Sequence, residues 1–280
     1  MAKTIVHWKK ELARIWTNYL PPCRPSCSEL VICTKYLRKI QSVTRNRQLN
    51  LLILGSTSEF RDWGHEENLN VTVIDYSEEY HQQIKWELRY KYIQEMFVNQ
   101  RWQDMFFENE FDIILGDLVV GNLKENELPR FLINVEKALV KDGFFITKSF
   151  FRKNDYTPKS LEEIFAEYKR SESKFHPFPS LIYDIAISCM NIKTGILSFN
   201  YMNNKIYKLY KSGVINKGLW EKFNCLGWEK NMKFGFFIPI ITQWETMVNK
   251  YLQIYSKDYG QDIYSNNFPV YVITTKKARS

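Results

Sequence analysis

Two short apolar runs separated by a small-residue turn constrain the fold of this chain more than any other feature. The first run, Leu51–Leu54, ends in the turn Gly55-Ser56-Thr57-Ser58, and the second run, residues 71–74, ends in the acid Asp75. Runs of this kind are typical of parallel strands that are buried on both faces beneath helices. The pattern therefore predicts an α/β protein with a mostly parallel sheet.

The turn and the acid together indicate a nucleotide site. Gly55 allows the backbone to turn sharply and to approach a ligand closely. An acid at the end of the next strand can accept hydrogen bonds from both hydroxyls of a ribose, and in dinucleotide folds it lies about 20 residues beyond the glycines. Asp75 follows Gly55 by 20 residues (75 minus 55). The turn has one glycine, so it contains no G-x-G-x-x-G motif.

Over roughly residues 45–152 the chain resembles the class I S-adenosylmethionine-dependent methyltransferases. Residues 55–59 stand where that family has a glycine loop under the methionine moiety. Residues 111–117 look like its fourth strand, and residues 138–146 look like its "L-K-P-G-G" turn and fifth strand. The resemblance implies a Rossmann-like, seven-stranded, mostly parallel sheet with helices on both faces. It also implies S-adenosyl-L-methionine as the cofactor.

The resemblance further implies which residues form the site. Asp75 would be the ribose acid, and residues 99–104 lie where the family commonly contacts adenine. Asp117 is expected to orient the cofactor or the substrate, and His176, in an aromatic stretch, is a second catalytic candidate. Arg24 could pair bidentately with the carboxylate of the cofactor. The predicted cofactor-binding residues are Gly55, Ser56, Thr57, Asp75, Tyr76, Arg101, Trp102, Asp117 and Arg24.

Each of these side chains also has an ordinary structural interpretation. Arg24 is a surface arginine, Trp102 a core residue and Asp117 a solvated acid at a strand end in that interpretation. The four histidines are scattered in the sequence, and none has a nearby Cys, Ser or Asp that suggests a triad. A structural role is therefore expected for every histidine except His176.

The expected activity is in-line methyl transfer to a small molecule or a peptide. No N/D-P-P-Y/F motif follows residues 111–117, which argues against methylation of the exocyclic amines of nucleic-acid bases. Three alternatives stay open: a catalytically inactive protein of the same fold that binds adenosyl ligands, an RNA methyltransferase, and an NAD-dependent oxidoreductase. The sequence does not identify the methyl acceptor or the oligomeric state.

Charge supports a nucleic-acid partner only weakly. The formal net charge is +8, and phosphate neutralisation supplies most non-specific binding energy. The basic residues are dispersed, however, and small clusters such as residues 45–47 and 276–279 are typical of a solvated surface. A nucleic-acid partner is not expected but is not excluded.

Cysteines and apolar runs indicate a cytoplasmic protein without a metal. Five cysteines, an odd number, fit a reducing compartment. Cys23, Cys27 and Cys33 have no fourth ligand at zinc-site spacing. Charges near the N-terminus argue against a signal peptide, and no apolar run is long enough to span a membrane.

Four segments are expected along the chain. They are an N-terminal helical segment that could cover the cofactor (1–44), the cofactor-binding core (45–152), a helical insertion that covers the substrate (153–230), and strands and a helix that complete the sheet (231–280). Ser26, with Glu29 three residues later, predicts the start of a helix that continues to about residue 43. Further helices are predicted at 3–20, 77–97, 125–140 and 242–255, mostly helical structure at 158–228, and strands at 232–238 and 270–274.

Overall fold

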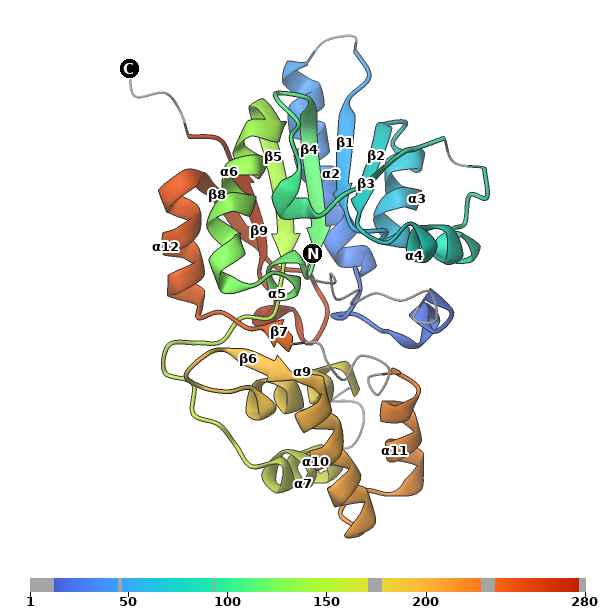
Figure 1. Cartoon of the computed structure of the whole chain (residues 1–280), viewed down its shortest axis with the longest axis vertical. Coiled ribbons are helices and arrows are strands. Elements are labelled where there is room, and N and C mark those ends of the chain that lie inside the picture. Colours follow the sequence, from blue (N-terminus) through green and yellow to red (C-terminus); the bar gives the residue numbers. More distant parts are fainter. Residues whose placement is uncertain (1–12, 45–46, 93, 171–177, 228–234, 277–280) are drawn as a thin grey trace, which may run out of the picture.

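The computed structural model describes residues 13–44, 47–92, 94–170, 178–227 and 235–276. Figure 1 shows a sheet with helices on both faces and, beyond one end of its strands, a smaller group of mostly helical elements. We call this group the cap. It consists of α7 (Leu161–Arg170), α9 (Phe178–Cys189), β6 (Ile196–Ser198), α10 (Phe199–Lys211), α11 (Lys217–Asn224) and β7 (Gly235–Phe237).

The main sheet has seven strands in the order β3-β2-β1-β4-β5-β9-β8. The first five strands in that order are parallel, and β9 runs antiparallel to both β5 and β8. This arrangement is the mostly parallel seven-stranded sheet that the sequence predicts. The strands are β1 (Asn50–Leu54), β2 (Asn70–Asp75), β3 (Met96–Asn99), β4 (Phe111–Asp117), β5 (Leu139–Lys148), β8 (Gln253–Asp258) and β9 (Val270–Thr274).

Helices cover both faces of the sheet because its strands are apolar on both faces. Successive strand residues point to opposite faces. Leu51 and Ile53 of β1 therefore join the core under α2 (Cys27–Val43) and α3 (Ser58–Glu66). Leu52 and Leu54 join the other core, under α6 (Leu128–Ala138) and α12 (Ile241–Tyr251). Burial of each such leucine contributes about 1.5–3 kcal/mol relative to exposure.

The start of α2 confirms the predicted capping box. The backbone N–H of Glu29 donates to Ser26 Oγ (3.3 Å), and the backbone N–H of Ser26 donates to Glu29 Oε2 (2.9 Å). Two N–H groups that a helix start leaves without partners are thereby satisfied. The helix ends at Val43, as the sequence predicts.

The predicted helix at 77–97 is wrong in its second half. Helix α4 (Glu78–Gln83) continues as a short 3-10 helix, η2 (Ile84–Glu87), and the chain then forms β3. Residues 96–99 pair in parallel with residues 72–75 of β2. This pairing overrides the local helical pattern, because strand formation depends on neighbours in the sheet more than on the segment itself.

The predicted sixth strand is also misplaced. Strand β7 pairs with β6 in a separate two-stranded sheet of the cap. The position beside β9 is taken by β8, part of which the sequence assigns to a helix at 242–255. That helix, α12, ends at Tyr251. The predictions at 125–140 and 270–274 are confirmed by α6 and β9.

Short helical turns complete the chain. Of the helix predicted at 3–20, residues 1–12 lie outside the described residues, and the remainder contains the 3-10 helix η1 (Trp16–Asn18). None of the described helices combines the length and the apolar character that crossing a membrane requires. The other turns are η3 (Trp102–Asp104), α5 (Val119–Asn122), η4 (Glu125–Glu127) and η6 (Ser265–Asn267).

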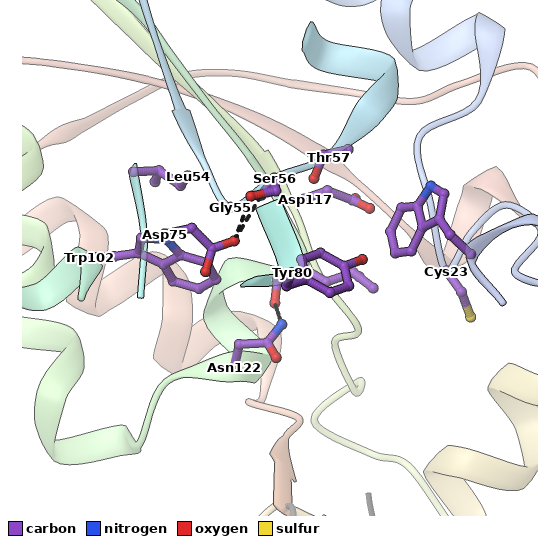
Figure 2. Close-up of a pocket in the computed structure, with 12 residues that line it drawn as sticks. Cys23, Leu54, Gly55, Ser56, Thr57, Asp75, Tyr80, Trp102, Asp117 and Asn122 are labelled. Atoms are coloured by element: carbon purple, nitrogen blue, oxygen red, sulfur yellow. Dashed lines mark hydrogen bonds between the residues drawn. The ribbon is translucent and has the colours of Figure 1, made fainter. Parts of the chain in front are cut away.

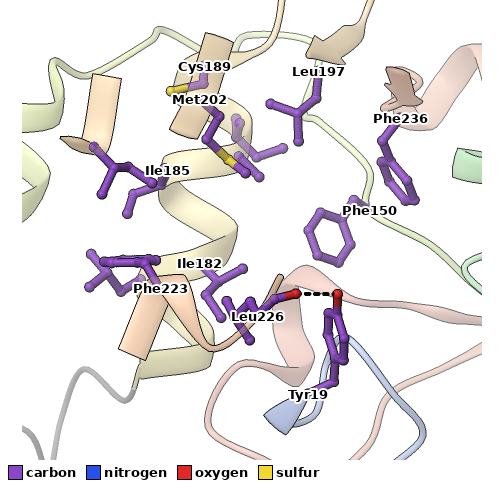
Figure 3. Close-up of a cluster of buried hydrophobic side chains, with 14 of the residues drawn as sticks. Tyr19, Phe150, Ile182, Ile185, Cys189, Leu197, Met202, Phe223, Leu226 and Phe236 are labelled. Carbon is purple, nitrogen blue, oxygen red and sulfur yellow. Dashed lines mark hydrogen bonds between the residues drawn. The ribbon is translucent and has the colours of Figure 1, made fainter. Parts of the chain in front are cut away.

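The cap is mostly helical, as predicted for 158–228, and its core is continuous with the rest of the molecule. Figure 3 shows Ile182, Ile185 and Phe223 of the cap in one apolar cluster with Phe150, which follows β5. The hydroxyl of Tyr19 donates to the carbonyl of Leu226 (2.7 Å), also drawn in Figure 3. This hydrogen bond therefore links the N-terminal segment to the cap.

Candidate functional site

A hollow lies where β1, β2 and β4 end. Strand order reverses at β1, which pairs with β2 on one side and β4 on the other, and ligands of open α/β sheets bind at such a point. Figure 2 shows the residues that line the hollow. They are Trp16, Cys23, Leu54, Gly55, Ser56, Thr57, Asp75, Tyr80, Trp102, Asp117, Leu118 and Asn122.

The turn after β1 requires glycine for two reasons. Gly55 has a φ of +93°, a conformation that L side chains rarely adopt. A Cβ at this position would lie 3.2 Å from Cζ2 of Trp102. The indole is held in place by Nε1–H, which donates to the carbonyl of Ile74 (3.0 Å). Trp102 thus forms a wall of the hollow directly against the glycine turn.

Asp75 is buried at the end of β2 and is held by backbone and side-chain donors. Its Oδ2 accepts from the backbone N–H of Ser56 (3.0 Å) and from Ser56 Oγ (2.9 Å), and its Oδ1 accepts from the N–H of Ser77 (3.1 Å). Burial raises the pKa of Asp75 to about 6, against the opposing effect of these hydrogen bonds. The carboxyl group is therefore oriented and titrates close to neutral pH.

Asp117 shares one buried cation with a second carboxylate. Lys148 Nζ donates to Glu29 Oε2 (2.5 Å) and lies 3.5 Å from Asp117 Oδ1. That oxygen of Asp117 makes no hydrogen bond to any residue that the structure describes, and the side chain is 4% exposed. Burial raises the pKa of Asp117 to about 7, although Lys148 acts to lower it. Asp117 thus lines the hollow as an acid that titrates near neutrality, and its Oδ1 lies on the side of Lys148.

Arg24 lies beside the hollow without lining it. Its guanidinium forms an ion pair with Glu59, at the start of α3, and Nη1–H donates to the carbonyl of Trp16 (3.2 Å). It also lies 5.3 Å from the centre of the Trp16 ring. In this arrangement Arg24 joins the N-terminal segment to α3.

Two further predicted residues, Tyr76 and Arg101, do not line the hollow. Tyr76 follows Asp75 in sequence but is not among the lining residues. Arg101 forms an ion pair with Glu127 of η4. His176 lies outside the described residues. The structure therefore groups Gly55, Ser56, Thr57, Asp75, Trp102 and Asp117 of the predicted set.

The fold places a serine and a glutamate beside His81, which the sequence does not indicate. In the fold, His81 Nδ1 lies 3.1 Å from Ser56 Oγ, and Nε2 lies 3.2 Å from Glu95 Oε1. The residues come from α4, the turn after β1 and the segment before β3. No local pattern in the sequence indicates this cluster, because its members meet only through the packing of α3 and α4 beside β3.

Comparisons with known proteins give structural matches only. No protein-family model matches the chain, and no curated protein matches its sequence. A Rhodobacter sphaeroides protein, assigned provisionally to the zinc-dependent alcohol dehydrogenases, has a TM-score of 0.59 at 14% identity over 98% of this chain and 100% of its own. The N-methyltransferase NodS from Bradyrhizobium japonicum WM9, in complex with S-adenosyl-L-homocysteine, has a TM-score of 0.50 at 11% identity, covering 97% of this chain and 100% of its own.

Both matches cover nearly the whole of this chain. The chain has the fold of the class I S-adenosylmethionine-dependent methyltransferases. At this level of identity the likeness concerns the methyltransferase fold and not a substrate.

The lining of the hollow has the character of a pocket for a small organic ligand. Among the residues that the structure describes, no three His, Cys, Asp or Glu side chains are grouped to hold a metal ion. The described thiols of Cys23, Cys27 and Cys33 are free. The hollow instead combines a glycine turn, an indole wall and two acids that titrate near neutrality.

Proposed function

We propose that the protein is an S-adenosylmethionine-dependent methyltransferase that acts on a small molecule or a peptide. One observation supports this most strongly: the buried carboxyl of Asp75 stands beside the glycine turn at the strand switch point of a methyltransferase fold. An acid in this position suits a ribose, whose two hydroxyls donate to its oxygens. When bound, S-adenosylmethionine supplies a methyl group on a positively charged sulfur.

The residues of the hollow divide into three roles in this proposal. Asp75 holds the ribose, and Gly55 with Ser56 and Thr57 leaves room for the amino-acid part of the cofactor. Trp102 offers a flat apolar surface for the adenine. Gly55 matters because any side chain there would meet the Trp102 ring and occupy this space.

Asp117 is the residue that would orient the reacting groups. Methyl transfer depends mainly on holding the nucleophile in line, and it needs a base only where the nucleophile is protonated. The carboxyl group of Asp117, which lines the hollow, can accept a hydrogen bond from an amine or a hydroxyl group. Because its pKa is about 7, Asp117 can also take up a proton at neutral pH.

A second function is favoured by the same turn. The chain has one glycine where the related loops have several, and Trp102 packs directly against it. Such a turn suits a protein that binds an adenosyl ligand without turning it over. Binding of the cofactor with no methylated product, across amine, hydroxyl, thiol and peptide acceptors, would support this function over the first.

The first prediction concerns binding of S-adenosyl-L-homocysteine, measured by calorimetry. We expect the wild-type chain to bind, and Asp75→Asn to weaken binding by about 10- to 100-fold, because hydrogen bonds to a charged group contribute about 1.5–3 kcal/mol. Asp142→Asn is the matched control: Asp142 is exposed, has a φ of +64° that asparagine tolerates, and lies outside the hollow.

Absence of wild-type binding at millimolar ligand would refute the assignment. A parallel fluorescence titration with NADH tests the oxidoreductase alternative, which requires binding of NADH in place of S-adenosyl-L-homocysteine. Salt-sensitive RNA binding is the minimum requirement of the RNA methyltransferase alternative.

A further inference from the structure

A chain of buried polar side chains lies behind the proposed ribose acid. Ser56 Oγ is 2.9 Å from Asp75 Oδ2 and 3.1 Å from His81 Nδ1. His81 Nε2 is in turn 3.2 Å from Oε1 of Glu95, whose carboxylate is paired bidentately with Arg61. None of the five side chains is more than 5% exposed. Figure 2 shows the Ser56 end of this chain directed at Asp75.

Glu95, at the far end of this row of polar side chains, determines which ring nitrogen of a neutral His81 carries the proton. Burial acts to raise the pKa of Glu95, but hydrogen bonds from His81 and Arg61 outweigh it and lower that pKa to about 2. Glu95 is therefore ionised at all ordinary pH values and can only accept hydrogen bonds. It follows that Nε2 of His81 bears a proton, which leaves Nδ1 to face Ser56.

The hydroxyl of Ser56 has one proton and touches two possible acceptors. Two arrangements satisfy all three groups. In the first, a protonated His81 Nδ1 donates to Ser56, and Ser56 donates to an ionised Asp75. In the second, a protonated Asp75 donates to Ser56, and Ser56 donates to a neutral His81. Each arrangement requires one proton shared between Asp75 and His81.

Burial shifts the pKa values of the two groups in opposite directions. Burial raises the pKa of Asp75 to about 6, and burial lowers the pKa of His81 from its usual value near 6.5. Two groups joined by one hydroxyl titrate as a pair. A ligand that changes the surroundings of either group can therefore decide which of them holds the proton.

We propose that His81 is a positioning residue for Asp75: the two share one proton through Ser56, and binding of a ribose diol moves that proton from Asp75 to His81. This inference rests on the proposed function, because the diol belongs to an adenosyl ligand. In the transfer Asp75 gives its proton to Ser56 Oγ while Ser56 gives its own to His81 Nδ1, so the net charge is unchanged. The diol drives the transfer because its hydroxyls donate best to an ionised carboxylate.

The other groups around the pair influence which of the two groups holds the proton. Lys85 of η2, together with Arg61, opposes protonation of His81, whereas Glu95 favours it. Phe97 of β3 stacks on the imidazole, with ring centres 4.1 Å apart. The groups facing Asp75 are Ser56, Ser77, the backbone of Tyr76 and the phenol of Tyr80, whose own pKa burial raises well above 10.0.

The direct test follows the imidazole itself. The full chain is labelled with ¹⁵N in its histidine rings and studied by NMR at pH 6, with the signals assigned by replacing His7, His65 and His176 in turn. Adenosine, which has the diol, is compared with 2′,3′-dideoxyadenosine, which lacks it. We expect adenosine to shift Nδ1 of His81 from its partly protonated position to that of the imidazolium, and the dideoxy compound to leave it unshifted.

A second test uses the pH dependence of S-adenosyl-L-homocysteine affinity. Wild-type affinity should change less than threefold between pH 8 and pH 5.5, because in the complex His81 holds the shared proton and Asp75 stays ionised. In His81→Phe that proton must sit on Asp75, so affinity should fall about tenfold for each pH unit below the pKa of the acid. His65→Gln, which removes an exposed histidine, should follow the wild type.

The outcomes separate this inference from the proposed function. Binding of S-adenosyl-L-homocysteine with an unchanged His81 ring would overturn the shared proton and leave the methyltransferase proposal intact. The same conclusion follows if both nucleosides shift the ring equally. No binding of any adenosyl ligand would overturn both. Because the NMR comparison uses the wild-type His81, it stands even where His81→Phe fails to fold.

Discussion

At the scale of single residues, the site contains more buried acidic groups than buried cations to pair with them. Lys148 is a single buried cation between two carboxylates, and Glu29 takes the shorter contact. Asp117 is therefore the surplus acid, which is a cost to folding that a ligand can offset. Within the part of the chain that the structure describes, no cation contacts Asp75, whose carboxyl group accepts from N–H and O–H donors instead. Acids left in this state are typical of binding and catalytic sites.

The surplus acid predicts a specific pH dependence of stability. Asp117 has a pKa of about 7 in the fold and 3.8 as an ordinary carboxyl, so the folded state binds a proton that the unfolded state has released. Stability from this group is present below pH 4 and is lost as the pH rises through 7. We expect the free energy of unfolding of Asp117→Asn, relative to wild type, to rise by about 1.4 kcal/mol per pH unit across part of this range.

Urea denaturation of both chains at pH 5, 6, 7 and 8 measures this difference. Glu108→Asn, at an exposed position outside the hollow, is the control for loss of a carboxylate. A constant offset between Asp117→Asn and wild type across the four pH values would contradict the assigned titration. The same variant should lose methyl-transfer activity while it keeps affinity for S-adenosyl-L-homocysteine.

At the scale of elements, the contact between α5 and β7 joins the end of β4 to the cap. Gly121 of α5 packs against the ring of Phe236 in β7. A Cβ at Gly121 would lie 1.9 to 2.3 Å from carbon atoms of that ring, which is far inside van der Waals contact. Only glycine allows the two elements to approach so closely. Because α5 directly follows Leu118 in the hollow, this contact also sets one wall of the site.

Gly121→Ala should therefore be destabilising by about 1–3 kcal/mol, the usual cost of overpacking a buried contact. Gly218→Ala is the matched control: it also lies in a helix, α11, and its nearest neighbour for an added Cβ is Asn216 Oδ1 at 3.6 Å. The control should be neutral or slightly stabilising, because alanine favours a helix over glycine. The measurement is the melting temperature of each variant in thermal unfolding. Equal melting temperatures would show that the α5–β7 contact adjusts to an added methyl group without loss of stability.

At the scale of the whole molecule, the cap and the N-terminal segment close over the ends of the strands. Their common core includes Tyr19, Ile84, Phe150 and Phe268, from four separate parts of the chain. Trp16 and Cys23 of the N-terminal segment line the hollow, so the segment forms part of the site.

Tyr19→Phe tests how firmly the segment is held. The substitution removes the hydrogen bond to the carbonyl of Leu226 and leaves that buried acceptor unpaired, at a cost of about 1–3 kcal/mol. Hydrogen exchange should become faster at residues 13–20 and 219–226 and stay unchanged in β1 and β4. Tyr207→Phe, at a residue that is 42% exposed, provides the comparison. Uniformly faster exchange throughout the sheet would instead mean that the hydrogen bond supports global stability alone.

Sequence by itself determined the central strands and the acid between them. Strands β1, β2, β4 and β5 each contain a short apolar run, and the interval from Gly55 to Asp75 is a property of the chain alone. The capping box at Ser26 is likewise local. Hydrophobic patterns, turn chemistry and caps act over a few residues, so they can be recognised without knowing what lies on the other side of the molecule.

Tertiary structure alone decided the short strands and the buried polar cluster. Strands β3 and β8 have helix-like local sequences and become strands because β2 and β9 offer them partners. Ser56 and His81 are 25 residues apart and meet only after α4 packs beside the sheet. Pairing and the burial of polar groups are energies of contact between distant segments. These energies arise only when folding brings the segments together, so they cannot be predicted from any local stretch of the sequence.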